Sequence, residues 1–188
     1  LVIKKKKKFP IKEDTDLLFL DDDKPRYTYY ISKILSEKLI KFFGQPFLIF
    51  RPHNIYGPRM GFSHVIPEQI KKIKNQLHSK VFSPDHKRAF CYIDDAINQM
   101  LQLCSSTKNY NKVFNIGNPN ESITMIKLSK LIRKQLKSKT KLVPSSVTSG
   151  SINNRVPFIK RQLQNKCKTS LEEGIKKTIS WYRKNENI

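Results

Sequence analysis

A helical pattern that runs directly into a short apolar strand constrains the fold of this chain most strongly. From Thr28 to Phe43, apolar residues recur at spacings of three and four, which predicts an amphipathic helix ending at Gly44. The next segment, 46–50, is a continuous apolar run and is typical of a strand buried on both faces of a parallel sheet. The loop 51–58 then leaves the carboxyl end of that strand, where open α/β sheets bind their ligands.

The rest of the chain continues the alternation of strands and helices. We expect helices at about 63–76, 94–103, 124–136 and 170–181, and strands at 81–82, 90–93 and 113–116. Asp94 or Asp95, Thr124 and Ser170 are the residue types that cap helix N-termini, and Ser170 begins a capping box with Glu173. This order of elements predicts an α/β architecture.

Length and composition exclude some classes of protein. The 188 residues suffice for one ordinary core or two small lobes. No apolar run approaches the roughly 18 residues that span a bilayer, and the apolar start 1–3 is too short for a signal peptide. We therefore expect a cytoplasmic protein. Cys91, Cys104 and Cys167 are widely spaced, which predicts unpaired thiols and no metal site.

The net charge of +22 permits a second hypothesis, a basic module that binds nucleic acid. Such a module needs lysines focused on one face together with exposed aromatic residues. Here the lysines are spread over nearly every segment, and the run Lys4–Lys8 is typical of a solvated tail. A coding bias toward Lys, Asn and Ile accounts for this pattern, so we expect only non-specific attraction to polyanions and no specific nucleic-acid partner.

Tyr29 and Lys33 lie one helical turn apart, which places both side chains on the same face of the predicted helix. A free phenol has a pKa near 10, so a phenol that acts as a base at pH 7 needs a pKa lower by about three, which corresponds to roughly 4 kcal/mol. A neighbouring ammonium acts in that direction. This spacing alone arises by chance in many helices, so the pair needs support from other motifs.

Further motifs follow in a fixed order and supply that support. They are Tyr29-x-x-Ser32-Lys33-x-x-x-Glu37, Arg51-Pro52-x-Asn54-x-Tyr56-Gly57-Pro58, Arg88-x-Phe90-x-Tyr92-Ile93-x-Asp95, the strand 113–117, Arg155-x-Pro157 and the segment 170–181. Together they resemble the extended short-chain dehydrogenase/reductase family, and more narrowly the NAD-dependent nucleotide-sugar epimerases and dehydratases. The resemblance implies a Rossmann-like parallel sheet, here truncated, with a smaller mixed α/β substrate-binding lobe.

The resemblance implies a role for each residue that matches the family's cofactor side. Tyr29 is implied to be the acid/base that removes a sugar hydroxyl proton while hydride passes to NAD. Lys33 is implied to stabilise the Tyr29 phenolate and to hold the nicotinamide ribose. Pro52 and His53 are implied to lie beside the nicotinamide, although packing alone also explains His53.

The substrate side of the resemblance involves three residues. Asn54 is implied to meet the diphosphate or the sugar of a nucleotide-diphosphate sugar, and Arg88 and Arg155 are implied to bind the diphosphate, a task that suits guanidinium groups. The alternative for Arg88 is a surface arginine, and Arg155, which stands beside a polar loop, is the weaker match of the two.

The sequence departs from the family pattern near its start. The family opens with a strand and a Gly-x-x-Gly-x-x-Gly turn, and none of the six glycines of this chain has that spacing. The family's catalytic Ser or Thr upstream of the Tyr has no convincing counterpart either. We therefore expect the C-terminal portion of such an enzyme. The alternative is a catalytically inactive fragment that at most binds a nucleotide sugar or a partner chain.

The resemblance also suggests a division of the chain and a mode of assembly. Residues 1–24 read as an irregular basic lead-in, 25–60 and 90–117 as the remnant of an NAD-binding domain, and 61–89 and 118–188 as the substrate lobe. The helix that carries Tyr29 and Lys33 could form a homodimer, with Ile34, Lys38 and Lys41 facing the partner.

Overall fold

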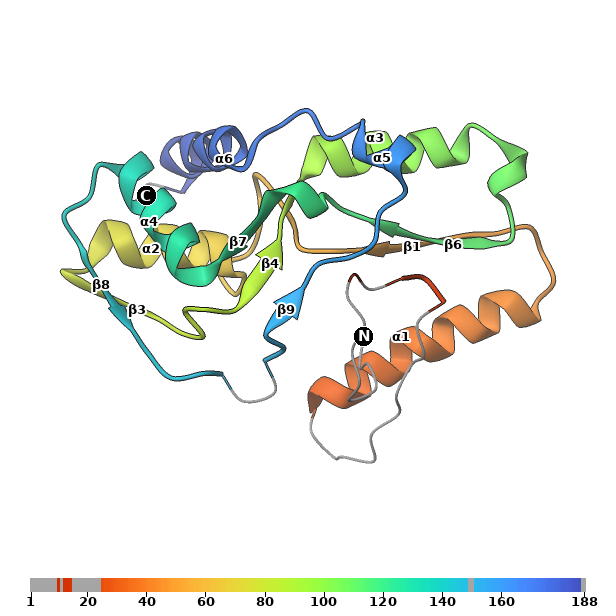
Figure 1. The fold of residues 1–188 in the computed structure, drawn as a ribbon, viewed down its shortest axis with the longest axis horizontal. Helices are drawn as coiled ribbons and strands as arrows, with labels where there is room; N and C mark the ends of the chain where they lie inside the picture. Colours follow the sequence, from red (N-terminus) through yellow and green to blue (C-terminus); the bar gives the residue numbers. More distant parts are fainter. Residues whose placement is uncertain (1–9, 11, 15–24, 149–150, 187–188) are drawn as a thin grey trace.

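The structure of the protein is a computed structural model that describes residues 10, 12–14, 25–148 and 151–186 (Figure 1). Most of the predicted lead-in 1–24 therefore lies outside the described residues. The helices are α1 Pro25–Phe42, α2 Val65–Asn75, α3 Ile93–Cys104, α4 Met125–Leu136, α5 Arg161–Gln164 and α6 Leu171–Asn185, with 3-10 turns η1 Thr107–Asn109 and η2 Pro119–Glu121. None of the helices in these residues combines the length and the apolar composition that a membrane span requires.

Parallel pairing of short strands is the main feature of the sheets. β1 Leu48–Pro52 pairs with β6 Lys112–Ile116, β2 Ile55–Tyr56 with β5 Cys91–Tyr92, and β3 His78–Val81 with β8 Lys141–Pro144, all in parallel. β4 Lys87–Ala89 is antiparallel to β7 Ser122–Thr124 and parallel to β9 Asn154–Arg155. Helices connect the parallel strands, so the predicted α/β class is confirmed.

The apolar run 46–50 contributes the first half of β1, in register Phe50 to Phe114 with β6. The prediction that this strand is buried on both faces is wrong, because Ile49 is its only buried residue and Pro52 is exposed. Within the described part of the chain β1 has β6 as its only partner strand, so its second edge lacks a neighbour. A strand at the edge of a sheet is less buried than a central strand, because only one of its edges is paired.

The larger hydrophobic core lies where α2, α4 and α6 meet the β2–β5 pair, at the left of Figure 1. Ile70, Ile132 and Ile175 contribute one fully buried side chain from each helix. Tyr56 and Tyr92 belong to the same core, with ring centroids 5.7 Å apart. A smaller cluster joins α3, α5 and the β1–β6 pair. The side chains of the two clusters hold the helices around β4 in place.

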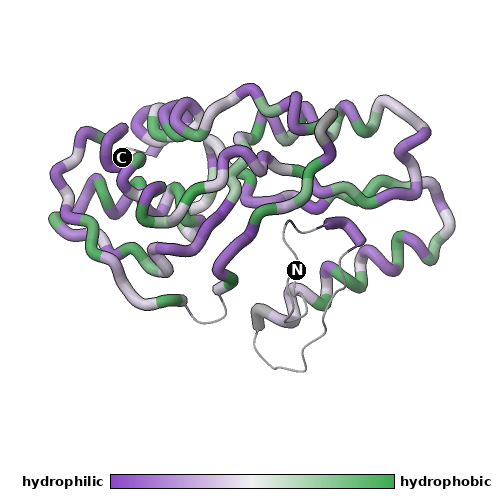
Figure 2. Tube along the Cα trace, in the orientation of Figure 1, coloured by the Kyte–Doolittle hydropathy of each residue, from purple (hydrophilic) through white to green (hydrophobic). Residues whose placement is uncertain are grey.

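Fewer described side chains are buried on helix α1 than on the other long helices. Among its described side chains only Ile34 is buried, so the expectation that Ile34 faces a partner chain is wrong. Apolar residues nevertheless recur along α1 (Figure 2), and Leu35, Leu39 and Phe42 are exposed. The predicted stop is confirmed, because α1 ends at Phe42 and Gly44 adopts a left-handed φ of 67°.

Two of the three predicted helix caps are confirmed. The Thr124 hydroxyl accepts a hydrogen bond from the Lys127 amide, and the Ser170 hydroxyl accepts one from the Glu173 amide. The cap predicted at Asp94 or Asp95 is wrong, because α3 begins at Ile93 and both aspartates lie in its first turn. The Asp95 carboxylate instead accepts the amides of residues 168 and 169 at 3.0 Å each, which fixes the entry to α6.

Candidate functional site

Tyr29 and Lys33 lie on one exposed face of α1, as their spacing predicts. The Lys33 ammonium is 5.4 Å from the centroid of the Tyr29 ring, and 59% of Tyr29 is exposed. Ser32 is not in position to hold the phenol, because its hydroxyl donates to the Tyr29 carbonyl at 2.8 Å. The structure therefore brings a phenol and an ammonium together at a solvent-accessible position.

A bidentate ion pair links α1 to β1 of the sheet. Arg51, at the carboxyl half of β1, donates from Nε and Nη2 to the two carboxylate oxygens of Glu37 at 2.8 and 2.7 Å. Its third nitrogen, Nη1, donates to the Glu13 carbonyl at 2.9 Å. The Arg51 and Glu37 side chains are only 10% and 20% exposed, so water screens the pair weakly. Both residues stood in the sequence motifs, but the motifs alone did not indicate that they form a pair.

His53 follows β1 and is held in place by two hydrogen bonds. Its amide donates to the Ile116 carbonyl at 2.9 Å, and its ring Nε2 lies 3.1 Å from the Asn115 side-chain oxygen. Burial lowers the pKa of His53, and the hydrogen bond to Asn115 offsets only part of that effect. This histidine is therefore predominantly neutral at pH 7 and bonded to its neighbours, which agrees with the packing interpretation of the sequence.

Asn54 adopts a left-handed conformation with φ 45°, which asparagine tolerates better than most residues. Its side-chain amide donates to the Ala89 carbonyl at 2.9 Å, and its own carbonyl accepts the Cys91 amide at 3.3 Å. These two bonds join the loop after β1 to the end of β4 and the start of β5. Asn54 is thereby fixed at the rim of a cavity.

That cavity, of about 390 Å³, contains two of the three residues predicted to bind substrate. Asn54 and Arg88 both line it, and so do the apolar residues Phe82 and Phe90. The other lining residues are Val65, Glu68, Gln69, Val81, Ser83, Met125, Ser129, Thr148 and Ser151. Apolar walls with hydroxyl and amide groups and one guanidinium suit a small polar ligand that carries negative charge, because the one carboxylate of the described lining, on Glu68, is paired with Lys72.

Arg88 is held at the wall of this cavity by neighbouring oxygens. Its Nη2 donates to the Ser151 hydroxyl at 2.9 Å, and its Nη1 donates to the Lys87 carbonyl at 2.8 Å. Ser151 also lies 2.9 Å from Nδ1 of His86. Desolvation lowers the pKa of His86, and the nearby charge of Arg88 adds to the effect. The positive charge on this wall thus belongs to Arg88.

The other predicted site residues lie outside the lining of this cavity. Arg155 stands beside Arg88 in the parallel β4–β9 register, but only Arg88 is among the described residues of the cavity wall. The described wall also contains neither Tyr29 nor Lys33, which lie on α1. The structure therefore divides the predicted residues between an exposed helix and a cavity.

Several polar residues of the cavity were not predicted from the sequence. Gln69 is buried, and its side-chain oxygen accepts the Ser129 hydroxyl at 3.1 Å. Ser83 has a left-handed φ of 48°, and its hydroxyl accepts the Thr148 amide at 3.0 Å. Of these residues only Gln69 could be recognised in the sequence, because it is a polar residue between Ile66 and Ile70 on the apolar face of its helix.

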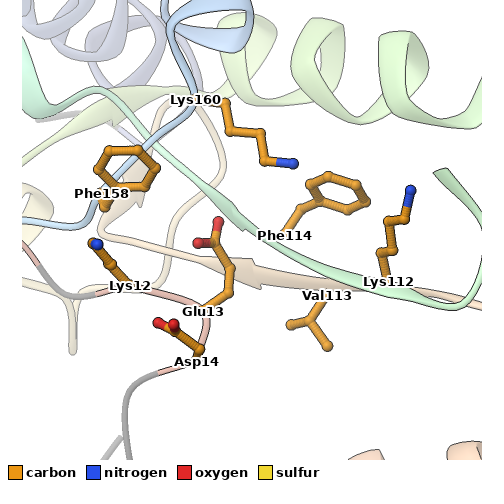
Figure 3. A pocket seen from close by; sticks show the side chains of 8 residues that line it. All are labelled: Lys12, Glu13, Asp14, Lys112, Val113, Phe114, Phe158 and Lys160. Atoms are coloured by element: carbon orange, nitrogen blue, oxygen red, sulfur yellow. The ribbon is translucent and has the colours of Figure 1, made fainter.

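A second hollow, of about 440 Å³, lies beside β6 and the described residues 12–14 (Figure 3). Lys160 lies over the Phe114 ring with its ammonium 4.9 Å from the centroid. The Glu13 side chain points into the space between Phe114 and Phe158, and its carboxylate accepts the Asn115 amide at 3.1 Å. Glu13 thus covers an amide of β6 that β1 does not use.

Comparison with protein families gives one match. The NAD dependent epimerase/dehydratase family matches residues 2–117, which is more than half of the chain and includes α1, β1, Asn54 and Arg88. The matched region therefore contains both the exposed pair and two residues of the cavity.

Two curated relatives and one solved structure are similar over most of the chain. UDP-D-apiose/UDP-D-xylose synthase 1 of Arabidopsis thaliana is 29% identical over 92% of this chain and 53% of its own length. UDP-N-acetyl-alpha-D-glucosaminuronate decarboxylase of Bacillus cytotoxicus is 30% identical over 95% of this chain and 60% of its own length. UDP-glucose 4-epimerase of Thermotoga maritima, solved with UDP-glucose, is 25% identical with a TM-score of 0.70, covering 84% of this chain and 52% of that one. The chain thus spans about half the length of the proteins it matches.

Proposed function

This chain belongs to the NAD-dependent epimerase/dehydratase family, and we propose that it supplies the acid/base pair and the substrate cavity of a nucleotide-sugar epimerase or dehydratase. The observation that carries the proposal is the cavity of about 390 Å³ that Asn54 and Arg88 share. Its guanidinium suits a diphosphate, and its aromatic walls suit a base or a sugar ring. The division into an NAD-binding remnant and a substrate lobe is part of the same proposal.

In this proposal Tyr29 exchanges a proton with a sugar hydroxyl. The Lys33 ammonium lies 5.4 Å from the centroid of the Tyr29 ring, on the same face of α1. The Arg51–Glu37 pair holds the helix against β1, so Tyr29 and Lys33 keep their position relative to the strand end. His53 acts by packing, because its ring is already bonded to Asn115.

NAD is the cofactor that the family implies, and the residues present fit one part of it. Lys33 and Tyr29 are exposed donors that suit the nicotinamide ribose hydroxyls, and Pro52 and His53 lie at the end of β1 where the nicotinamide is expected. When bound, NAD takes up and returns a hydride. The 188 residues hold no Gly-x-x-Gly-x-x-Gly turn, so the pyrophosphate contacts of the family have no counterpart here.

The chemistry of the cavity and the names of the relatives support the proposed substrate class. Each of the three similar proteins is named for a UDP-linked sugar. Arg88 would bind the diphosphate, Asn54 would contact the diphosphate or sugar, and Arg155 would add charge from the neighbouring strand β9. A homodimer through α1 is a further part of the proposal, supported by the exposed Leu35, Leu39 and Phe42.

One observation favours a second function, binding of a nucleotide sugar without turnover. Tyr29 is 59% exposed, and water screens the attraction between its phenolate and the Lys33 ammonium. A chain that keeps the cavity but not a desolvated acid/base pair would bind the substrate class and leave it unchanged.

Calorimetry with UDP-glucose, UDP and uridine tests the cavity, and product analysis with NAD present tests turnover. We expect saturable binding of UDP-glucose and UDP, weaker binding of uridine, and a roughly 10- to 100-fold loss in Arg88→Met, because a charged hydrogen bond is removed. Lys130→Met, an exposed change on α4, serves as the control. Equal binding by Arg88→Met and the native chain would contradict the proposal. Binding with no product, unchanged in Tyr29→Phe, would support the second function.

A further inference from the structure

A further hollow lies along the exposed side of α6, away from the cavity of Asn54 and Arg88. It has a volume of about 580 Å³. It is lined by Pro58, Glu173, Lys176, Lys177, Ser180, Trp181, Lys184 and Asn185. All but Pro58 belong to α6, so the hollow follows the axis of that helix. We call it the α6 groove, and the proposed function makes no use of it.

The single tryptophan of the chain lines this groove. Trp181 packs against the larger core and forms an edge-to-face contact with Tyr182, with ring centroids 5.1 Å apart. Its main-chain carbonyl accepts the Asn185 side-chain amide at 2.8 Å. Packing against the core and Tyr182 therefore holds the indole, while part of it remains accessible. A fixed, partly exposed indole is a surface on which a planar ring can stack.

Ammonium groups line the groove along its length. Lys177 is paired with Glu173 at 2.8 Å, and its ammonium also lies 5.4 Å from the centroid of the Tyr92 ring. Lys176 and Lys184 are exposed, and among the described residues neither has an ion-pair partner. They stand eight residues apart, or roughly 12 Å along the helix axis. The groove thus offers two available positive charges on either side of Trp181.

We propose that the α6 groove binds single-stranded nucleic acid without sequence preference, with one base stacked on Trp181 and backbone phosphates at Lys176 and Lys184. A base stacks on an aromatic ring whatever its identity, and lysines follow the phosphate chain. Ser180 and Asn185 add polar groups beside the ring. The net charge of +22 favours the encounter, whereas the groove decides where the strand lies.

Charge spacing favours a polymer over a single nucleotide. The two available ammonium groups lie about 12 Å apart along the helix by its rise per residue, so one phosphate group does not serve both. Phosphates that repeat along a nucleic-acid strand contact both ammonium groups. A duplex hides its base faces and leaves Trp181 nothing to stack on, so single strands should bind more tightly than duplexes of equal length.

Fluorescence anisotropy of labelled dT12, with the quenching of Trp181 as a second signal, tests the proposal on the full chain. We expect at least tenfold weaker binding in the double variant Lys176→Glu/Lys184→Glu. The matched control Lys127→Glu/Lys130→Glu makes the same change of net charge on exposed positions of α4 and should lose less than threefold. The slope of log K against log salt concentration should become less negative by roughly 1.4 in Lys176→Glu/Lys184→Glu, because each lost phosphate contact contributes about 0.7.

Two substitutions of Trp181 separate stacking from packing. Trp181→Leu keeps an apolar side chain and should bind roughly 5- to 100-fold more weakly, whereas Trp181→Phe should lose less than fivefold. Circular dichroism checks that both remain folded. Equal losses in the α6 and α4 double variants, unquenched Trp181 fluorescence, or duplex binding as tight as dT12 binding would each overturn the proposal. Binding of dTMP at the same affinity as dT12 would overturn the polymer assignment as well.

Discussion

Helix α1 and the region around the cavity differ in what holds them. The cavity stands among α2, α4 and β4, supported by fully buried residues such as Ile70 and Ile132. α1 buries one described side chain, Ile34, and depends on the Arg51–Glu37 pair. Hydrophobic burial therefore stabilises the proposed substrate site, whereas a charge pair positions the proposed acid/base site. The two halves of one chemistry should respond differently to the same kind of mutation.

The largest expected difference comes from removing an apolar side chain in each region. Ile132→Ala should lower the free energy of unfolding by roughly 2–5 kcal/mol, because it leaves a cavity in a fully buried position. In dilute, monomeric protein Leu39→Ala on α1 should change it by less than about 1 kcal/mol, because Leu39 is 46% exposed within one chain. Urea unfolding monitored by circular dichroism measures both. Equal losses would show that a buried interface covers α1 in solution.

A smaller effect should follow from weakening the ion pair that fastens α1. Glu37→Gln leaves the Arg51 guanidinium without its charged partner, and should cost roughly 1–3 kcal/mol of local stability. Amide hydrogen exchange is the suitable measurement, because α1 can open without the core. We expect faster exchange along α1 and unchanged exchange in α2 and α4.

Glu173→Gln provides the matched control for that experiment. It breaks the Lys177–Glu173 pair, whose side chains are 48% and 51% exposed, and should cost less than about 0.5 kcal/mol. If Glu37→Gln has no larger effect on α1 than Glu173→Gln has on α6, the Arg51–Glu37 pair does not position α1.

The smallest expected effect concerns pH and His53, at the boundary between the two regions. Its folded-state pKa is lowered below 6.5, chiefly by burial. The unfolded chain therefore binds a proton that the folded chain does not, and His53 makes stability fall as pH drops below about 6.5. His53→Gln should flatten the dependence of unfolding free energy on pH between about 7 and 5. An unchanged slope would place that dependence on other groups, such as His86.

The sequence predicted features that depend on local spacing. The helix that ends before Gly44, the caps at Thr124 and Ser170, and the shared face of Tyr29 and Lys33 all arise within a few residues of each other. Hydrophobic periodicity and capping chemistry act over this range, so one sequence suffices.

Features that depend on distant contacts were not predictable in this way. Asp95 was expected to cap its own helix, yet its carboxylate binds amides more than 70 residues later. Strand β8 pairs with β3, about 60 residues earlier in the chain, and β1 is less buried than its composition suggests. The cavity wall likewise joins Ser83, Ser129 and Ser151 from separate segments. Such partners become visible only when the fold brings them together.

Chemical-shift mapping by NMR during a titration with UDP-glucose locates the nucleotide-sugar site residue by residue. We expect the largest shifts at the backbone amides of Ser83, Arg88 and Ser151, with smaller shifts near Asn54 and none along α6. Shifts confined to the hollow beside β6, or no shifts at millimolar UDP-glucose, would contradict the assignment of the Asn54–Arg88 cavity as the nucleotide-sugar site.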